Sequence, residues 1–405
     1  MTKHVVVVGS SIAGLMHAVA LKSHGHDVVV LELRSEQQLQ ARAAGLSLWE
    51  KAQKVITTYI PDVDLNEIVF HNPALQIADG NGSVLAEIPM TEDVRTSCWA
   101  GIHGLLWMAC EKEAEGHGTV TIMCGHQVLG VTEQGDRVVV AYKDNRGTEG
   151  KMDADLVIAA DGARSRVRSL VLPDVKTEYA GYVAWRAQCL ETDAPEELHA
   201  ATQGKLPIYM FDGSYILAYL SPNQIGSMRP GERVIEWCWY DPCDPSSPEF
   251  ADYMTDVNGI RHNVTVPANL LRPEVWEAQL NRRDAVLSPL WKKVIQDSGM
   301  PLLTAVQSFD NTKASFFSGK VLLAGEAFIQ IRPHLGASCD IAGLSALTLP
   351  GVLNGDMSLE EWEAGLVKHA MEKSIGSKAT GIFGMTGKWP EGYTPESAAE
   401  FADKA

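Results

Sequence analysis

The sequence lacks the features that would place the chain in a membrane or outside the cell. None of its apolar runs approaches the roughly 20 residues that a membrane-spanning helix needs. The chain passes from His4 directly into a strand pattern, without the basic start, long apolar stretch and cleavage site of a secretory signal. The seven cysteines form no CxxC pair, so neither a disulfide framework nor a zinc site is indicated. We expect a cytoplasmic protein with reduced cysteines and no bound metal.

The chain also has fewer basic than acidic residues. The chain holds 34 Lys and Arg residues against 51 Asp and Glu residues, which gives a formal net charge of -17 at pH 7. Such a surface repels a phosphate backbone, and no basic run with interleaved aromatic residues offsets this repulsion. Nucleic acid is therefore not an expected partner.

The first segment that carries a functional signal is "HVVVVGSSIAGLMHAVALKSHGHDVVVLEL", residues 4–33. The run Val5–Val8 is typical of a strand buried on both faces of a parallel sheet, and Ile12–Leu21 has the pattern of a helix. A second apolar strand, Val28–Leu31, is followed by Glu32, whose carboxylate stands where a ribose is bound in such units. The segment predicts a dinucleotide-binding βαβ unit. Because a lone fingerprint is a weak signal, a strand-turn-helix that binds nothing is the alternative.

The turn of this unit departs from the G-x-G-x-x-G pattern at its middle glycine. Gly9 would make the tight turn and Gly14 would allow close packing of the helix, while Ser11 takes the position that approaches the phosphates. Serine is small and its hydroxyl can donate to a phosphate oxygen. The amides at the start of the helix still point at the anion. The turn is therefore compatible with a pyrophosphate.

Two later segments have a similar strand-turn-helix form. The first, "DADLVIAADGARSRVRSLV" (residues 153–171), has an apolar strand that ends in an Asp-Gly pair and is followed by a basic helical segment. The second, "SGKVLLAGEAFIQIRPHLGASCDIAGLSALTL" (residues 318–349), has an apolar strand that ends in a Gly-Glu pair. A turn containing P-H-L-G and a helix of small residues follow that pair.

These three motifs, in this order, resemble the signatures of the class A flavoprotein monooxygenases, the aromatic hydroxylases that use one FAD and an NAD(P)H co-substrate. Those signatures are an N-terminal G-x-G-x-x-G, an Asp-Gly pair near the middle of the sequence, and a late G-D followed by P-x-x-G. Within that family, the stretches "YAGYVAWR", "MTDVNGIR" and "IRPHLGAS" look most like the 2,6-dihydroxypyridine 3-hydroxylases. The resemblance covers nearly all of the sequence to about residue 350.

The resemblance implies a binding site for FAD and a place where NAD(P)H meets it. Residues 9–14 would cradle the FAD pyrophosphate, Glu32 would bind the adenosine ribose, and Arg164 would lie near the nicotinamide nucleotide. The amides of Gly336 to Ser338 would stabilise negative charge on the reduced ring. The cofactor-binding residues that the resemblance implies are Gly9, Ser10, Ser11, Ile12, Ala13, Gly14, Glu32, Leu33, Arg34, Arg42, Ala43, Gln127, Asp161, Gly162, Arg164, Gly325, Glu326, Pro333, Gly336, Ala337 and Ser338.

The same resemblance supplies the candidates for catalysis, which are His334, Arg332 and Tyr182. His334 is either a proton donor or base near the flavin, or a partly buried histidine with no catalytic role. Tyr182 is the second candidate for a base that removes the proton of a ring hydroxyl. The match of "YVAWR" also suggests that Arg186 or Trp185 contacts the substrate.

Several positions depart from the family pattern. Ser10 stands where relatives commonly have glycine, Glu326 replaces the usual aspartate, and Asp340 occupies a position often held by asparagine. An ionised Asp340 beside a reduced, anionic flavin would cost electrostatic stabilisation. The departures therefore suggest that this protein binds flavin more weakly than its relatives do.

The chain is long enough for more than one structural unit, with 405 residues of which 45% are hydrophobic. We expect an α/β fold, in which a Rossmann-like FAD-binding domain with a parallel sheet and helices carries an inserted, mostly antiparallel β-sheet substrate domain. One face of the substrate sheet would roof the active site. The predicted boundaries are 1–72, 97–176 and 285–350 for the FAD-binding domain, 73–96 and 177–284 for the substrate domain, and 351–405 for a C-terminal helical segment.

The function that these expectations support is an FAD-dependent monooxygenase. It would hydroxylate a small, electron-rich aromatic or heteroaromatic substrate through a flavin hydroperoxide, with NAD(P)H and O2 as co-substrates. The C-terminal segment would pack against the fold or form a homodimer contact. Two alternatives stay open: a protein of the same fold that performs non-redox chemistry, such as a cyclisation or isomerisation of a small molecule, and a non-catalytic interaction protein.

Overall fold

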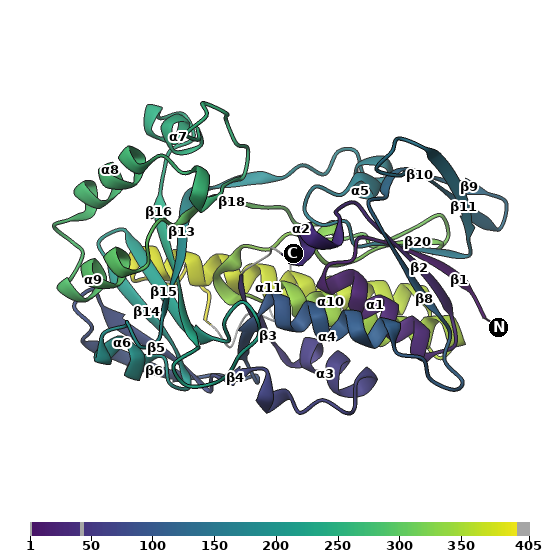
Figure 1. The fold of residues 1–405 in the computed structure, drawn as a ribbon, viewed down its shortest axis with the longest axis horizontal. Helices are drawn as coiled ribbons and strands as arrows, with labels where there is room; N and C mark the ends of the chain where they lie inside the picture. Colours follow the sequence, from purple (N-terminus) through teal and green to yellow (C-terminus); the bar gives the residue numbers. More distant parts are fainter. Residues whose placement is uncertain (1, 41–43, 395–405) are drawn as a thin grey trace.

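The computed structural model describes residues 2–40 and 44–394. Two sheet-centred regions lie at opposite ends of an elongated molecule, and long helices run between them (Figure 1). One region holds a six-stranded, largely parallel sheet and the other an eight-stranded, largely antiparallel sheet, with two three-stranded sheets beside them. The predicted α/β fold with its two kinds of sheet is confirmed. Within the described residues, no helix has both the length and the apolar character needed to cross a membrane.

The six-stranded sheet contains the strands that the three motifs predicted. Its order is β19-β20-β12-β1-β2-β8, and every neighbouring pair is parallel except β19 with β20. Its parallel core is apolar because helices α1 (Ile12–Ser23) and α4 (Trp99–Glu111) pack against it, and so does the small sheet of β9 (Gln127–Gln134), β10 (Arg137–Lys143) and β11 (Glu149–Ala154). The strands are β1 (His4–Val8), β2 (Asp27–Glu32), β8 (Val120–Cys124), β12 (Leu156–Ala159), β19 (Ser315–Phe316) and β20 (Val321–Leu323).

The eight-stranded sheet joins segments from distant parts of the sequence. Its order is β17-β18-β13-β16-β15-β14-β5-β6, and only β14 with β5 is a parallel pair. The mostly antiparallel substrate sheet expected from the sequence is therefore present. The strands are β5 (Ala74–Asp79), β6 (Val84–Pro89), β13 (Glu178–Leu190), β14 (Lys205–Phe211), β15 (Ser214–Ser221), β16 (Val234–Pro242), β17 (Thr265–Val266) and β18 (Leu302–Ser308).

Side-chain alternation along β16 assigns the two faces of this sheet. Trp237 and Trp239, two residues apart in the strand, point to the same face and are buried in a core that also contains Trp276 and Trp291. Cys238 and Tyr240 alternate with them and belong to a separate buried cluster on the other face. That other face is the one turned toward the candidate site.

Helices connect and cover the sheets. The first motif leads into α1 (Ile12–Ser23), as predicted, and the late motif leads into α10 (Ser338–Asn354). The longest helix, α11 (Leu359–Thr386), starts with a capping box and contacts both α10 and the strands β14 and β15, so it runs from one region to the other (Figure 1). The other helices are α2 (Glu36–Gln40), α3 (Glu50–Tyr59), α4 (Trp99–Glu111), α5 (Arg166–Val171), α6 (Glu196–Ala201), α7 (Pro248–Tyr253), α8 (Pro273–Arg283) and α9 (Pro289–Asp297).

Short elements complete the fold of the described residues. The two small sheets have the orders β11-β10-β9 and β3-β7-β4. Their strands are β3 (Gly45–Leu48), β4 (Phe70–His71), β7 (Arg95–Cys98), β9 (Gln127–Gln134), β10 (Arg137–Lys143) and β11 (Glu149–Ala154). The single 3-10 turns are η1 (Leu65–Glu67), η2 (Ala268–Leu270), η3 (Gly325–Ala327) and η4 (Pro333–Leu335).

The segment 285–350, predicted to belong to the FAD-binding domain, contributes to both regions. Its strand β20 lies in the six-stranded sheet, whereas β18 pairs with β13 of the eight-stranded sheet. Helix α9 also supplies Trp291 and Val294 to the core beneath the eight-stranded sheet. The domain boundaries themselves stay a prediction.

Candidate active site

The three motif turns lie side by side because their strands are neighbours in one sheet. β1, β12 and β20 are adjacent and parallel, so the turns that follow them meet at a single edge. A Cβ on Gly9 would lie 2.6 Å from the carbonyl oxygen of Ala160, and one on Gly325 would lie 2.7 Å from the Cβ of Ala13. Both glycines also have positive φ, which other residues rarely adopt. The three turns therefore form one continuous surface.

The start of α1 presents hydrogen-bond donors at this surface. The first amides of a helix, here those of Ile12, Ala13 and Gly14, have no partner within the helix itself. Ser11 is the N-cap residue, its side chain makes no capping hydrogen bond, and the first turn contains no acidic residue. The positive end of α1 and the Ser11 hydroxyl therefore suit a bound anion such as a pyrophosphate.

Glu32 lies at the end of β2, and the neighbouring turn holds its carboxylate in place. Its Oε2 accepts hydrogen bonds from the Ser10 amide at 2.8 Å and from the Ser10 hydroxyl at 3.0 Å, and its Oε1 accepts one from the Arg34 amide at 2.8 Å. Lone pairs remain for the hydroxyls of a ribose. Ser10, a departure from the family pattern, thus adds a bond to this carboxylate. His103 of α4, which the sequence did not single out, lies with Nε2 2.9 Å from the Ser10 carbonyl oxygen.

Asp161 of the second motif is engaged with its own helix. Its carboxylate accepts hydrogen bonds from the Ser165 hydroxyl at 2.5 Å and from the amides of Arg166 and Val167 at 2.7 and 3.2 Å. Burial raises the pKa of Asp161, although these hydrogen bonds act against that rise. Asp161 therefore fixes the turn, and Gly162 beside it leaves open space where a Cβ would stand.

Arg168 joins the second motif to the third. Its guanidinium donates to the carbonyl oxygens of Glu326 and Ala327, each at 3.2 Å, and to that of Ala163. It also lies over the ring of Phe309, 4.1 Å from the ring centroid. The sequence indicated only a basic helical segment here, because nothing local reveals a partner 158 residues away.

A cleft of about 370 Å³ lies between the late motif and one face of the eight-stranded sheet. Glu326, Pro333, Gly336 and Ser338 line one side of it. Strand β3 supplies Ser47, so close to Gly336 that a Cβ there would lie 2.7 Å from the serine Oγ. The opposite side is formed by residues of β13, β15 and β16. Apolar side chains with a few polar groups line the cleft, which is the composition of a small-molecule site.

His334 lies at the edge of the cleft between two tyrosines. Its Nε2 is 2.6 Å from the Tyr182 hydroxyl, and its Nδ1 hydrogen bonds with the Tyr215 hydroxyl of β15. Burial, with a smaller contribution from the charge of Arg332, lowers the pKa of His334 to about 3. The imidazole is therefore neutral near pH 7, and one of its nitrogens donates while the other accepts.

Arg332 and Tyr182 complete this cluster. The guanidinium carbon of Arg332 lies 5.7 Å from the centroid of the Tyr182 ring. Burial raises the pKa of Tyr182, and the nearby charge of Arg332 acts in the opposite direction. The ring of Tyr240 lies against the imidazole of His334, with 4.5 Å between their centroids. The structure thus brings the three predicted catalytic residues together and adds Tyr215 and Tyr240, which sequence reasoning missed.

Helix α11 covers this cluster with two glycines. A Cβ on Gly381 would collide with the imidazole of His334. A Cβ on Gly384 would lie 2.5 Å from Cδ1 of Tyr215. Glycine at these positions allows the helix to lie directly on the histidine and the tyrosine. The position of the imidazole therefore depends on α11, which comes after the late motif and the whole of α10 in the sequence.

The other predicted cofactor residues are more dispersed. Leu33 is 63% exposed, and Gln127, at the start of β9, and Arg164 are also exposed. Ala337 is buried at the start of α10. Their roles stay predictions. The remaining two, Arg42 and Ala43, lie outside the described residues.

The weaker flavin binding expected from Asp340 stays a prediction, and the structure shows which groups this residue contacts. Its carboxylate is buried and does not line the cleft. It accepts a hydrogen bond from the Lys51 amide at 2.7 Å and lies 2.8 Å from Nε2 of His369. Burial alone would raise the pKa of Asp340, but His369 and Lys373 outweigh burial and lower it. Asp340 connects α10 with α3 and α11.

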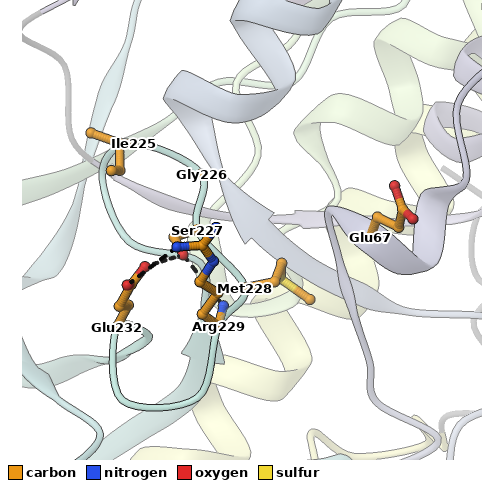
Figure 2. Close-up of a pocket in the computed structure, with 7 residues that line it drawn as sticks. All are labelled: Glu67, Ile225, Gly226, Ser227, Met228, Arg229 and Glu232. Carbon is orange, nitrogen blue, oxygen red and sulfur yellow. Dashed lines mark hydrogen bonds and ion pairs between the residues drawn. The ribbon is translucent and has the colours of Figure 1, made fainter.

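A second hollow shares no lining residue with the cleft (Figure 2). It is formed by Glu67 and by the hairpin that contains residues 225–229 and Glu232. Its polar groups already pair with one another, since the Ser227 hydroxyl donates to Glu232 at 2.5 Å and Arg229 lies 3.9 Å from the same carboxylate. We therefore do not regard this hollow as the functional site.

Comparison with known proteins finds two family models and several relatives that match this chain. The family model described as FAD binding domain matches residues 4–54, and one described as FAD binding domain-like matches residues 179–308. The 2,6-dihydroxypyridine 3-monooxygenase of Paenarthrobacter nicotinovorans is 28% identical over 369 residues, which are 89% of this chain and 86% of that protein. The 3-hydroxybenzoate 6-hydroxylase 1 of Aquipseudomonas alcaligenes is 27% identical over 49% of this chain and 50% of that protein.

A solved structure is similar over almost the full length. The 2,6-dihydroxypyridine-3-hydroxylase from Arthrobacter nicotinovorans matches with a TM-score of 0.81 and 25% sequence identity. The match covers 98% of this chain and 96% of that protein. The similarity in fold thus extends over both of the larger sheets.

Proposed function

We propose that this chain, which is similar to the FAD-dependent aromatic hydroxylases over almost its full length, hydroxylates a single small, electron-rich aromatic or heteroaromatic ring. NAD(P)H would be the reductant and O2 the source of the oxygen atom. The observation that carries the proposal is that three motif turns meet at one edge of a sheet and that the last of them lines a cleft of about 370 Å³, which suits one ring beside a flavin.

The residues present fit FAD. The start of α1 and the Ser11 hydroxyl would hold the pyrophosphate, and Glu32 would hold the adenosine ribose. The segment from Pro333 to Ser338 would lie beside the isoalloxazine, where the first amides of α10 favour negative charge. When bound, FAD supplies the transfer of reducing equivalents from NAD(P)H to O2 and of one oxygen atom to the ring.

The protein would handle the proton of a ring hydroxyl through Tyr182 and His334. A neutral imidazole accepts a hydrogen bond at one nitrogen and donates one at the other, so it can connect two hydroxyl groups without becoming charged. Arg332 favours partial negative charge on the Tyr182 oxygen, so this oxygen would accept a hydrogen bond from a ring hydroxyl and make the ring carbon more reactive. With a pKa of about 3, His334 does not serve as a charged acid near pH 7.

The apolar walls of the cleft would exclude water from the reaction. Leu46, Ile208 and Leu217 line it from three different strands. Exclusion of water by these side chains would favour transfer of oxygen to the ring over release of peroxide. The sheet face would thus provide both the place for the ring and the dry surroundings.

Measurement of O2 uptake tests the proposed function. The holoenzyme, mixed with NADH or NADPH and a panel of phenols and hydroxypyridines, should consume equal amounts of reductant and O2 with at least one panel member and form a hydroxylated product. Coloured protein without oxygen-linked turnover on any ring would contradict the proposal. Turnover of a ring without NAD(P)H or O2 would favour the non-redox alternative.

A further inference from the structure

We propose that Arg186 is the residue that selects the substrate, by binding an anionic oxygen on the ring, either an ionised hydroxyl or a carboxylate. This inference rests on the proposed function, since it concerns the occupant of the same cleft. It names the substrate class as rings that carry a negative charge opposite the site of proton withdrawal.

Strand alternation separates Arg186 from its neighbour. The sequence left open whether Arg186 or Trp185 contacts the substrate. Trp185 is fully buried in the core on the far face of the sheet, where its ring centroid lies 5.0 Å from that of Trp276. Arg186 is on the opposite face of β13 and lines the cleft. Only Arg186 can therefore meet a ligand there.

The guanidinium of Arg186 has donors to spare. An arginine has five N–H donors, and the Tyr219 hydroxyl, which interacts with this guanidinium, can accept only some of them. No nitrogen of Arg186 is among the buried polar atoms that lack a partner. A nitrogen that has no partner is therefore accessible, and because Arg186 lines the cleft, its remaining donors face the cleft. Among the described residues, Arg186 forms no direct ion pair with a carboxylate. A charged, forked donor set in an otherwise mainly apolar cleft suits an anionic oxygen.

The charge of Glu236 influences how tightly this site binds an anion. It is 9% exposed and close enough to Arg186 for each to influence the pKa of the other. Burial raises the pKa of Glu236, while Arg186 and the Gly45 amide act against that rise. The negative charge of Glu236 would therefore weaken the attraction between Arg186 and an anionic ligand. Removal of the Glu236 charge should strengthen anion binding, and removal of the Arg186 charge should weaken it.

The distance along β16 between the position of Arg186 and that of His334 matches the size of one aromatic ring with its substituent. Arg186 is opposite Cys238 in the strand register, and the imidazole of His334 packs on Tyr240. Two residues of strand separate Cys238 from Tyr240, a distance of about 7 Å. A six-membered ring held at Arg186 by one substituent would therefore present its opposite edge to the Tyr182 and His334 pair.

Ligand titration of the holoenzyme tests this inference. In the absence of O2 and NAD(P)H, the flavin absorbance change gives the Kd of 2,6-dihydroxypyridine, of 3-hydroxybenzoate and of the neutral ether 2,6-dimethoxypyridine. The first two ligands distinguish an ionised hydroxyl from a carboxylate. Arg186→Gln should raise the Kd of the preferred anion about 10- to 100-fold, as expected for loss of a charge-assisted hydrogen bond, and leave that of the ether nearly unchanged.

Three further variants make the result specific. Arg186→Lys should lie between wild type and Arg186→Gln, because it keeps the charge without the fork. Glu236→Gln should bind the anion more tightly than wild type, an effect that damage to the fold would not produce. Arg229→Gln, in the hollow of Figure 2, removes a surface arginine and should change no Kd.

The inference is overturned if Arg186→Gln retains flavin and binds the anions like wild type, or if wild type binds neither anion more tightly than the ether. Either result stands apart from the test of the proposed function, because these titrations require no turnover. Conversely, specific anion binding without O2 uptake would leave Arg186 as the anchor and reject the monooxygenase.

Discussion

Replacement of Glu32 by alanine should yield a purified protein that has lost most of its flavin. The change removes the acceptor for the Ser10 amide, the Ser10 hydroxyl and the Arg34 amide, and it removes the expected partner of the ribose. Hydrogen bonds to a charged group contribute about 1.5 to 3 kcal/mol each, so loss of the ribose contacts should weaken FAD binding about 100-fold or more. Fluorescence titration of flavin-free protein with FAD measures the change.

Glu32→Gln is the matched control for this experiment. The amide keeps the size of the side chain and one acceptor oxygen, so it should still bind the Ser10 amide and should fall between wild type and Glu32→Ala. Thermal denaturation of the flavin-free proteins separates loss of the ribose contact from loss of the fold. Equal FAD affinity in wild type and Glu32→Ala would show that the first motif does not hold the cofactor.

Gly381→Ala should lower both activity and stability, because the new methyl group would occupy the place of the His334 imidazole. Overpacking of a buried site typically costs about 1 to 3 kcal/mol in the free energy of unfolding. The displaced imidazole would also lose its alignment with Tyr182, so we expect kcat to fall about 10-fold or more while the FAD content stays normal. Steady-state kinetics, flavin content and thermal denaturation check these effects.

Gly365→Ala in the same helix is the control. A Cβ at Gly365 would meet no atom within 4 Å, so the substitution adds only helix propensity, worth about 0.5 to 1 kcal/mol of stabilisation. It should leave kcat unchanged. If Gly381→Ala behaves like Gly365→Ala in both stability and kcat, then α11 does not hold His334 in place.

Much of the fold could be predicted because its signals are local. The β-branched run at Val5–Val8 indicates a buried parallel strand, and alternation in "EWCWY" assigns Trp237 and Trp239 to one face. The order of three similar strand-turn-helix segments also indicates that they share one sheet. These features depend on residues close together in sequence, where periodicity carries the information.

The contacts that shape the site could not be predicted, because they join distant segments. Tyr215 bonds to a histidine 119 residues away, and Arg168 bonds to a carbonyl 158 residues away. Asp340 is a second example of a residue whose partners the sequence does not reveal. Its residue type and position in the motif suggested a charge at the flavin, and the structure pairs it with the Lys51 amide and His369. Sequence spacing gives the position of a residue on an element but not the partner that it finds.

A crystal structure of the protein grown with excess FAD tests the central claim most directly. We predict one FAD per protein molecule, with its pyrophosphate at the start of α1, its adenosine ribose on Glu32, and its ring system beside residues 333–338 facing the Arg186 side of the cleft. An FAD bound elsewhere, or a cleft filled by the protein's own side chains at saturating FAD, would contradict the account.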